Sequence, residues 1–231
     1  MRRFVTLGGG GFSMEPENPL LDDFLLGLTG VARPRVCFVP TAGGDSDNYI
    51  MRFYQALARK TEASHLTLFN RAIRDIGAFV RGHDLIFVGG GNTANMLAVW
   101  RVHGVVDALA AAADAGVILA GVSAGALCWY EAGVTDSFGP HLDALDALGW
   151  LPGGFCPHYD GDPLRRPVTH RLVAEGRLGT VHAADDGAAL VWEDGKLVAV
   201  VSSRPDARAY RVERDVSGAA VETALPARYL G

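Results

Sequence analysis

The stretch Gly116-Val117-Ile118-Leu119-Ala120-Gly121-Val122-Ser123-Ala124-Gly125 decides the fold, and Ala126-Leu127-Cys128-Trp129-Tyr130 follows it. An apolar, β-rich run ends at a serine that stands between small residues, and good helix formers come directly after. A strand that passes into a helix through a short turn is the repeating unit of α/β proteins. We therefore expect a strand over Gly116 to Val122 and a helix over Ala126 to Tyr130.

The same alternation of strand and helix patterns occupies the first half of the chain. Short β-rich runs lie at Phe4 to Leu7, Arg35 to Pro40, His65 to Phe69 and Asp84 to Val88, and helical patterns lie at Asn48 to Lys60, Thr93 to Trp100 and Val105 to Ala115. Such alternation predicts right-handed βαβ units and a mostly parallel sheet with helices on both faces. In such folds the functional groups lie at the carboxyl ends of the strands.

The last third of the chain has a different pattern. Ala188 to Trp192 and Leu197 to Ser202 flank Glu193-Asp194-Gly195-Lys196, which predicts a hairpin. We expect antiparallel strands near the C-terminus that complete one α/β domain over residues 1–231, because no linker or repeat interrupts the sequence.

Composition restricts the class of partner. The 231 residues are 49% hydrophobic and carry a formal net charge of −5. Mixed charges without a basic block argue against nucleic-acid and membrane partners and favour a small molecule or short peptide. The N-terminal segment does not resemble a signal peptide, so we expect a cytoplasmic protein, for which a homodimer is compatible with the sequence. Three cysteines without metal-type spacing predict buried free thiols.

Two glycine clusters follow expected strands. Gly8 to Gly11 lacks the third glycine of a dinucleotide fingerprint, and Gly89 to Gly91 lacks the lysine of a phosphate loop. We interpret the first cluster as a tight turn. The second can bring backbone N–H groups close to a reacting oxygen if a nucleophile lies nearby.

Gly121-Val122-Ser123-Ala124-Gly125 offers that nucleophile, since it fits G-x-S-x-G between a strand and a helix. The alternative is that Ser123 only caps the helix, and the pentapeptide alone leaves both interpretations open. A catalytic serine needs a histidine base. Of seven histidines, His158 is the best placed, because Phe155 to Tyr159 reads as a short strand that places it near a carboxyl end.

Taken together, Val88-Gly89-Gly90-Gly91-Asn92-Thr93, Gly121-Val122-Ser123-Ala124-Gly125-Ala126 and Pro157-His158 resemble the peptidase E (aspartyl dipeptidase) family, which is related to the cyanophycinases. The resemblance implies a three-layer sandwich like that of class I glutamine amidotransferases and a serine peptidase without metal or organic cofactor. It also implies a nucleophile at Ser123, a general base at His158 and oxyanion N–H groups at Gly90 and Ala124. We assign the substrate contacts to Gly90, Gly91, Asn92 and Ala124.

The acid of the triad is where this sequence departs from the family pattern. The resemblance places a glutamate in the turn that here reads Ala184-Asp185-Asp186-Gly187, so Asp186 takes its position. Aspartate is one methylene shorter and can still orient an imidazole after a shift of about 1.5 Å. Asp136 and Asp185 are the alternative acids.

Substrate preference depends on a charged group near the site. A preference for an N-terminal aspartate requires a cation, and Arg165, Arg166 and Arg171 follow His158, either as that cation or as solvated helix residues. The alternatives to a dipeptidase are another serine hydrolase (an esterase, an amidase or a cyanophycinase-like enzyme) and a non-catalytic binding protein. His158, Asp160 and Asp162 alone do not make a metal site.

Overall fold

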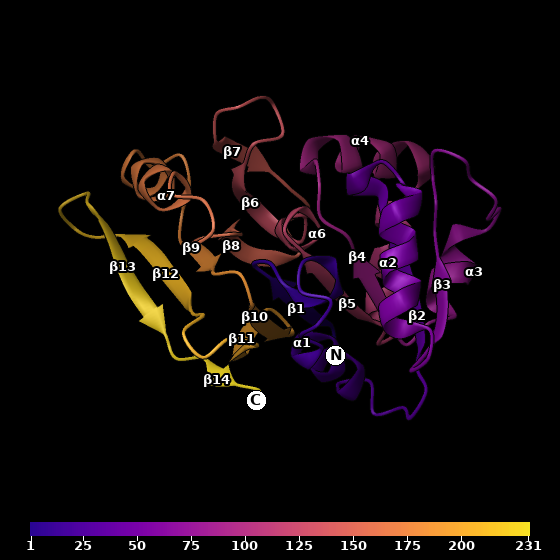
Figure 1. Cartoon of the computed structure of the whole chain (residues 1–231). Coiled ribbons are helices and arrows are strands. Elements are labelled where there is room, and N and C mark those ends of the chain that lie inside the picture. Colours follow the sequence, from indigo (N-terminus) through magenta and orange to yellow (C-terminus); the bar gives the residue numbers. More distant parts are fainter.

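The computed structural model describes all 231 residues, and its largest sheet has eight strands (Figure 1). Five of them run parallel in the spatial order β3-β2-β4-β5-β1: β1 (Arg3–Leu7), β2 (Arg35–Val39), β3 (Glu62–His65), β4 (Leu85–Val88) and β5 (Ile118–Val122). The expected hairpin extends this sheet from β1, as β10 (Ala188–Glu193) and β11 (Lys196–Ser202), and β14 (Arg228–Tyr229) ends it. The mostly parallel sheet is thereby confirmed.

Helices cover both faces of this sheet, because its strands are apolar on both sides. Phe38 packs in one cluster with Phe53 of a helix on one face, whereas the next residue, Val39, packs with Trp100 and Leu109 on the other face. The first face carries η1 (Gly11–Ser13), α1 (Leu20–Gly27) and α2 (Asp47–Leu57). The second carries α3 (Ile76–Arg81), α4 (Thr93–His103) and α5 (Val105–Asp114), and η2 (Thr41–Gly43) lies beside α4. These are the three layers of the expected sandwich.

A second sheet of six strands was not predicted. Its order is β13-β12-β9-β8-β6-β7, and its strands are β6 (Tyr130–Thr135), β7 (Asp143–Asp146), β8 (Leu151–Cys156), β9 (Val181–Ala184), β12 (Ala209–Arg214) and β13 (Ala220–Leu225). Helix α7 (Arg165–Ala174) covers a separate apolar cluster on this sheet. The C-terminal antiparallel strands are therefore divided between two sheets, since β10 and β11 join the first and β12 and β13 the second.

Two local expectations need correction. The helix after Ser123 was expected over Ala126 to Tyr130, but α6 spans only Ala124–Leu127, and Tyr130 begins β6. The Tyr130 hydroxyl is buried and hydrogen-bonded to Thr6 of β1 at 2.9 Å, so tertiary contacts outweigh local helix propensity. The third strand lies at Glu62–His65 rather than over His65 to Phe69, and Leu66 and Leu68 pack into the core from the loop that follows.

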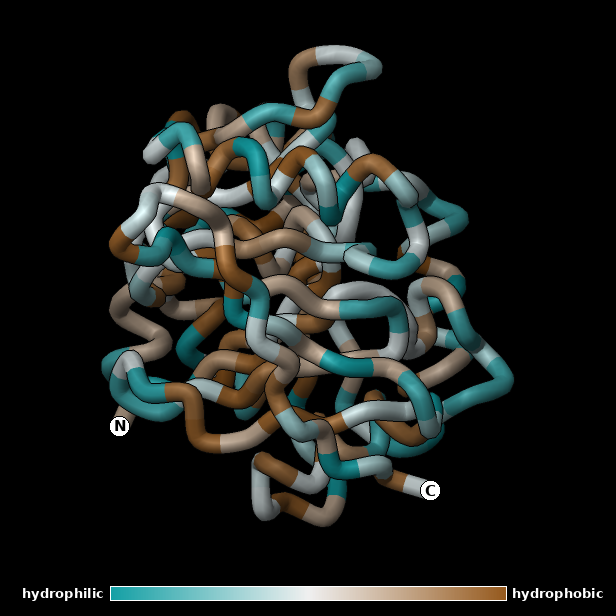
Figure 2. Tube along the Cα trace, turned by 90° about the vertical axis from the view of Figure 1, so that its left-hand side faces the viewer, coloured by the Kyte–Doolittle hydropathy of each residue, from teal (hydrophilic) through white to brown (hydrophobic).

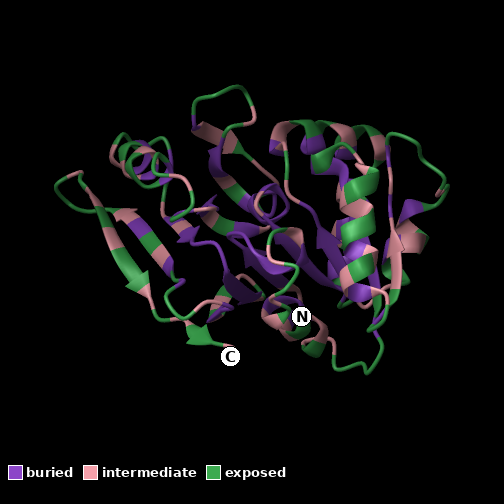
Figure 3. Cartoon of the chain, in the orientation of Figure 1, coloured by how far each residue is buried: buried purple, intermediate pink, exposed green.

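Burial is greatest along the central strands. Figure 2 shows hydrophobic segments mainly inside the molecule and hydrophilic ones mainly in outer loops, and Figure 3 shows that β1, β4 and β5 are buried while α2 exposes its outer side. All three cysteines are buried and free, as expected. No single helix is long and apolar enough to cross a membrane; α4 and α5 reach that criterion only as a pair, and their axes are bent by 86°.

Candidate active site

Ser123 lies at a sharp turn between β5 and α6. Its backbone has φ 56° and ψ −115°, a region in which side chains are strained and which is typical of a nucleophile elbow. From Gly121 to Tyr130 it is the one residue that is not fully buried. Its side chain makes no capping hydrogen bond to α6, which removes the alternative that Ser123 serves as a helix cap.

The two glycines of the motif are required by close approaches of the backbone. A β-carbon on Gly121 would lie 2.0 Å from the carbonyl oxygen of Gly125, and one on Gly125 would lie 2.3 Å from that of Val88. Both distances are far below van der Waals contact. The glycines therefore allow α6 to begin directly against the ends of β4 and β5, which presents Ser123 at the carboxyl edge of the sheet.

His158 and Asp186 come from the second sheet and form a hydrogen-bonded pair. His158 follows β8 and Asp186 follows β9, and these strands are parallel neighbours, so their carboxyl ends meet at one edge. Nδ1 of His158 lies 2.6 Å from Oδ1 of Asp186. A carboxylate at Nδ1 orients the imidazole and leaves Nε2 to accept a proton, as a triad base requires.

Asp186 is suited to this position electrostatically. Burial acts to raise its pKa, but the hydrogen bond and charge of His158, together with the charges of Arg204 and Arg165, hold the pKa below its usual value. The backbone N–H of Asp186 donates to Asp160 at 2.7 Å, which anchors the turn. The carboxylate therefore stays ionised at neutral pH.

The alternative acids are engaged elsewhere or lie in solvent. Asp136 is exposed, and its side chain has no contact with His158. Asp185 is buried and accepts hydrogen bonds from the Arg208 backbone N–H and the Tyr210 hydroxyl rather than from His158. Burial raises the pKa of Asp185 to about 6. Of the three candidates, Asp186 is the one that is hydrogen-bonded to His158.

The first glycine cluster, which we interpreted from the sequence only as a tight turn, also packs against the turn that carries Asp186. Gly9 forms a parallel bridge with Asp186, and a β-carbon on Gly9 would lie 1.9 Å from Oδ1 of Asp186 and 3.0 Å from Nδ1 of His158. A β-carbon on Gly8 would lie 2.4 Å from the carbonyl oxygens of Ala184 and Asp185. The end of β1 thus supports the turn that holds the acid.

Ser123 and His158 line one pocket of about 270 Å³, although no hydrogen bond joins their side chains in this structure. Catalytic hydrogen bonds are often long in the absence of substrate. The pocket is lined by Ser13, Met14, Tyr49, Arg52, Gly90, Gly91, Val122, Ser123 and His158. Its walls come from both sheets and from α2, so only the tertiary structure assembles it.

Comparison with known proteins agrees with this geometry. The family description "Peptidase family S51" matches residues 4–200. The chain belongs to peptidase family S51. It is 49% identical over 235 residues to a Bacillus subtilis protein named uncharacterized peptidase YgaJ, with all of both chains covered. It is 30% identical over 203 residues to peptidase E of Streptomyces coelicolor, covering 78% of this chain and 76% of that protein. The resemblance to peptidase E is confirmed.

Solved structures support the fold. A peptidase from an acI-B1 actinobacterium superposes with a TM-score of 0.72 at 20% identity, covering 98% of this chain and 95% of that one. A putative peptidase E protein from Listeria monocytogenes gives a TM-score of 0.65 at 20% identity, covering 87% and 98%. At this identity the likeness concerns the fold alone.

The backbone N–H groups near Ser123 are not all free to stabilise an oxyanion. The Gly90 N–H donates to the Tyr49 hydroxyl at 3.1 Å and is not free for an oxyanion, contrary to our expectation. The Gly91 N–H has no acceptor, and Ala124 is the first residue of α6, where N–H groups lack intrahelical partners. Both therefore remain available near Ser123.

Asn92 was expected to contact the substrate, but its side chain caps a helix instead. Its side chain accepts from the Asn95 N–H at 2.9 Å as the N-cap of α4 and donates to the Ser137 carbonyl at 2.9 Å. Both ends of the amide are thus used, and Asn92 does not line the pocket. The sequence could have indicated this capping role, because asparagine is a preferred N-cap residue and Asn92 directly precedes a helical pattern.

The arginines expected near the substrate are also engaged elsewhere. Arg165 is buried and donates to the Val134 carbonyl at 3.2 Å. Arg166 pairs with Glu222 at 2.6 Å and stacks between two tyrosine rings, and Arg171 pairs with Glu175. The residues after His158 do not gather into a group of metal ligands. Sequence reasoning missed Arg52, which lines the pocket from α2.

Proposed function

We propose that this family S51 peptidase is a serine-type dipeptidase that cleaves short peptides, with Asp-X dipeptides as the first class of substrate to test. The observation that carries the proposal is the arrangement of Ser123, partly exposed at an elbow and free of a capping role, in one pocket with an imidazole held by Asp186. The peptidase E resemblance supports the dipeptide class.

The mechanism follows from these positions. Oγ of Ser123 attacks the peptide carbonyl while Nε2 of His158 takes the hydroxyl proton, and Asp186 stabilises the imidazolium that forms. The Gly91 and Ala124 N–H groups stabilise the oxyanion of the tetrahedral intermediate. His158 then returns the proton to the leaving amine, and the acyl group stays on Ser123.

Deacylation reverses these roles. Water loses a proton to His158 and attacks the acyl carbonyl, and the Ser123 oxygen leaves with the proton that His158 returns. Each proton moves between substrate, serine, water and imidazole, and water is the only reactant needed besides the peptide. The expected cytoplasmic location and the homodimer stay predictions.

The test is intact-mass measurement after incubation with a fluorophosphonate, followed by hydrolysis of Asp-X dipeptides. We expect one adduct on the wild type and none on Ser123→Ala, and a loss of turnover of about 10⁴-fold or more in that variant. Near-normal hydrolysis by Ser123→Ala would exclude the scheme.

A panel of substrates separates the dipeptidase from the other hydrolases. An adduct on Ser123 with cleavage of esters, simple amides or β-linked acidic polymers, but not of dipeptides, would retain the serine and change the substrate class. Absence of both an adduct and hydrolysis would favour a binding protein on the same fold. Folding of each variant is checked by its circular dichroism spectrum.

A further inference from the structure

The charge of the catalytic pocket indicates what it binds. Arg52 is the one permanently charged side chain among the nine that line it, and no aspartate or glutamate is among them. A concave site that contains a guanidinium and no carboxylate favours an anionic part of the ligand.

Arg52 differs from the other arginines around the site because it has no partner. It is exposed on α2 and forms no ion pair or hydrogen bond in this structure. Arg204, which lies near Gly187, pairs with Glu15, while Arg165 and Arg166 are engaged on the second sheet. Arg52 is therefore the guanidinium at this pocket that is free to bind a ligand.

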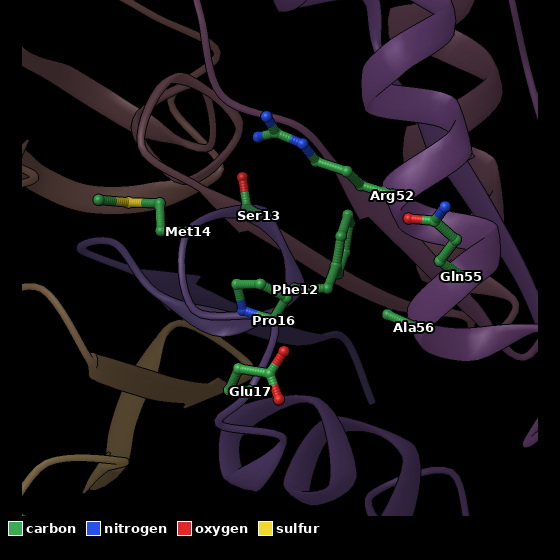
Figure 4. A pocket seen from close by; sticks show the side chains of 8 residues that line it. All are labelled: Phe12, Ser13, Met14, Pro16, Glu17, Arg52, Gln55 and Ala56. Atoms are coloured by element: carbon green, nitrogen blue, oxygen red, sulfur yellow. The ribbon is translucent and has the colours of Figure 1, made fainter.

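A second pocket continues from the catalytic one. It encloses about 600 Å³ and shares Ser13, Met14 and Arg52 with the catalytic pocket. Figure 4 shows the Arg52 side chain extending from α2 with its guanidinium toward Ser13, and Glu17 on the opposite side of the pocket. Arg52 thus stands at the junction of the two pockets, in the same pocket as Ser123.

The two pockets favour ligand groups of opposite charge. Glu17 is exposed, has no ion-pair partner and lines only the second pocket. A carboxylate there repels an anionic group and attracts an ammonium, whereas Arg52 has the opposite preference. The anionic group of a ligand is accordingly favoured at the junction rather than deeper in the second pocket.

We propose that Arg52 is a specificity-determining residue that binds a carboxylate of the peptide substrate. This inference rests on the proposed function, since it assigns the substrate class of the same site. A guanidinium offers two parallel N–H donors that match a carboxylate, and the position beside Ser123 lets that contact orient the scissile bond. The carboxylate belongs either to an acidic side chain or to the C-terminus of a short peptide.

Binding of three peptides to the full-length Ser123→Ala protein, measured by calorimetry, tests the proposal without requiring turnover. The peptides are Asp-Leu, Asn-Leu, which lacks the side-chain carboxylate, and Asp-Leu-amide, which lacks the C-terminal one. Each is measured with Arg52 intact, with Arg52→Gln, with Arg52→Lys and with Arg59→Gln. Arg59 is the matched control, because it is an exposed arginine just after α2 that lines neither pocket.

We expect Arg52→Gln to weaken Asp-Leu binding about tenfold, because a charge-assisted hydrogen bond at a solvent-accessible site is worth about that factor. The loss of affinity caused by Arg52→Gln should be smaller for the one peptide that lacks the contacted carboxylate. That peptide shows which of the two carboxylates Arg52 binds. Arg52→Lys should retain part of the affinity, and Arg59→Gln should bind as the parent does.

Equal loss of affinity for all three peptides, or no loss for any, would overturn the proposal, as would undetectable binding of Asp-Leu to the Ser123→Ala parent. Failure of the proposed function is seen separately, as absence of both a fluorophosphonate adduct and peptide hydrolysis with the wild type. Arg52-dependent binding without the adduct and without hydrolysis would support carboxylate recognition and reject catalysis.

Discussion

A β-carbon on Gly9 would lie 1.9 Å from Oδ1 of Asp186, the oxygen that is hydrogen-bonded to His158. The residue at position 9, two residues beyond the end of β1, therefore has to be glycine if the acid is to hold the imidazole. This contact joins the first sheet, which carries Ser123, to the second, which carries the His158–Asp186 pair. It makes the strand end a determinant of the site although it contributes no side chain.

Gly9→Ala should consequently lower turnover by about 10²-fold, because a displacement of about 1 Å in a catalytic group has that effect. The change is measured as kcat/KM on the best dipeptide. Gly27→Ala is the matched control, since a β-carbon at Gly27, the last residue of α1, meets nothing within 4 Å. Equal activity of the two variants would contradict the contact.

Asp186→Asn should reduce kcat by about 10⁴-fold, because an amide at that position stabilises the wrong imidazole tautomer and provides no charge for the imidazolium. Asp136→Asn should leave kcat near the wild-type value, since Asp136 is exposed and makes no contact with His158. Steady-state kinetics of both variants decide the acid. The reverse order of effects would assign the role to Asp136.

Ser123→Gly should be more stable than Ser123→Ala by about 1 kcal/mol, although both are inactive. The backbone at φ 56° and ψ −115° is accessible to glycine and strained for alanine, and such strain is worth about 1–3 kcal/mol before the extra chain entropy of glycine is subtracted. Urea unfolding followed by circular dichroism measures the difference. A Ser123→Gly protein less stable than Ser123→Ala would show that the elbow is not strained.

Asp22 should make the stability of the protein fall as the pH rises from about 4 to about 7. Burial of its side chain on the inner side of α1 raises the pKa of Asp22 to about 7, against an ordinary value of 3.8. In this window the folded protein keeps a proton that the unfolded chain has lost, so the unfolded state binds fewer protons and rising pH favours unfolding. The full effect amounts to about 4 kcal/mol, reached above pH 7.

Asp22→Asn removes this contribution. The variant should gain stability over the wild type progressively between pH 4 and 7, with a constant difference above that range. Asp23→Asn is the control, because Asp23 is an exposed neighbour on the same helix. A stability difference between Asp22→Asn and the wild type that does not change with pH would refute the raised pKa.

Much of the first sheet and part of the site could be predicted from the sequence, because both rest on local patterns. Apolar runs followed by small residues indicated β1, β2, β4 and β5, and the Gly-x-Ser-x-Gly spacing indicated an elbow at Ser123. These features depend on residues within a few positions of one another. The hairpin of β10 and β11 could be predicted in the same way, because its turn at Asp194 and Gly195 is a local sequence signal.

The tertiary structure alone decided which distant residues meet. The second sheet begins at Tyr130, where a local helix pattern yields to a hydrogen bond with Thr6. The family resemblance already favoured Asp186 over Asp136 and Asp185, but the hydrogen bond between His158 and Asp186 and the position of Arg52 at the pocket depend on how two sheets and α2 converge. The amino-acid order determined the strand–turn–helix units, because local backbone preferences act over a few residues. Long-range packing determined the site, because its members are brought together only when both sheets are complete.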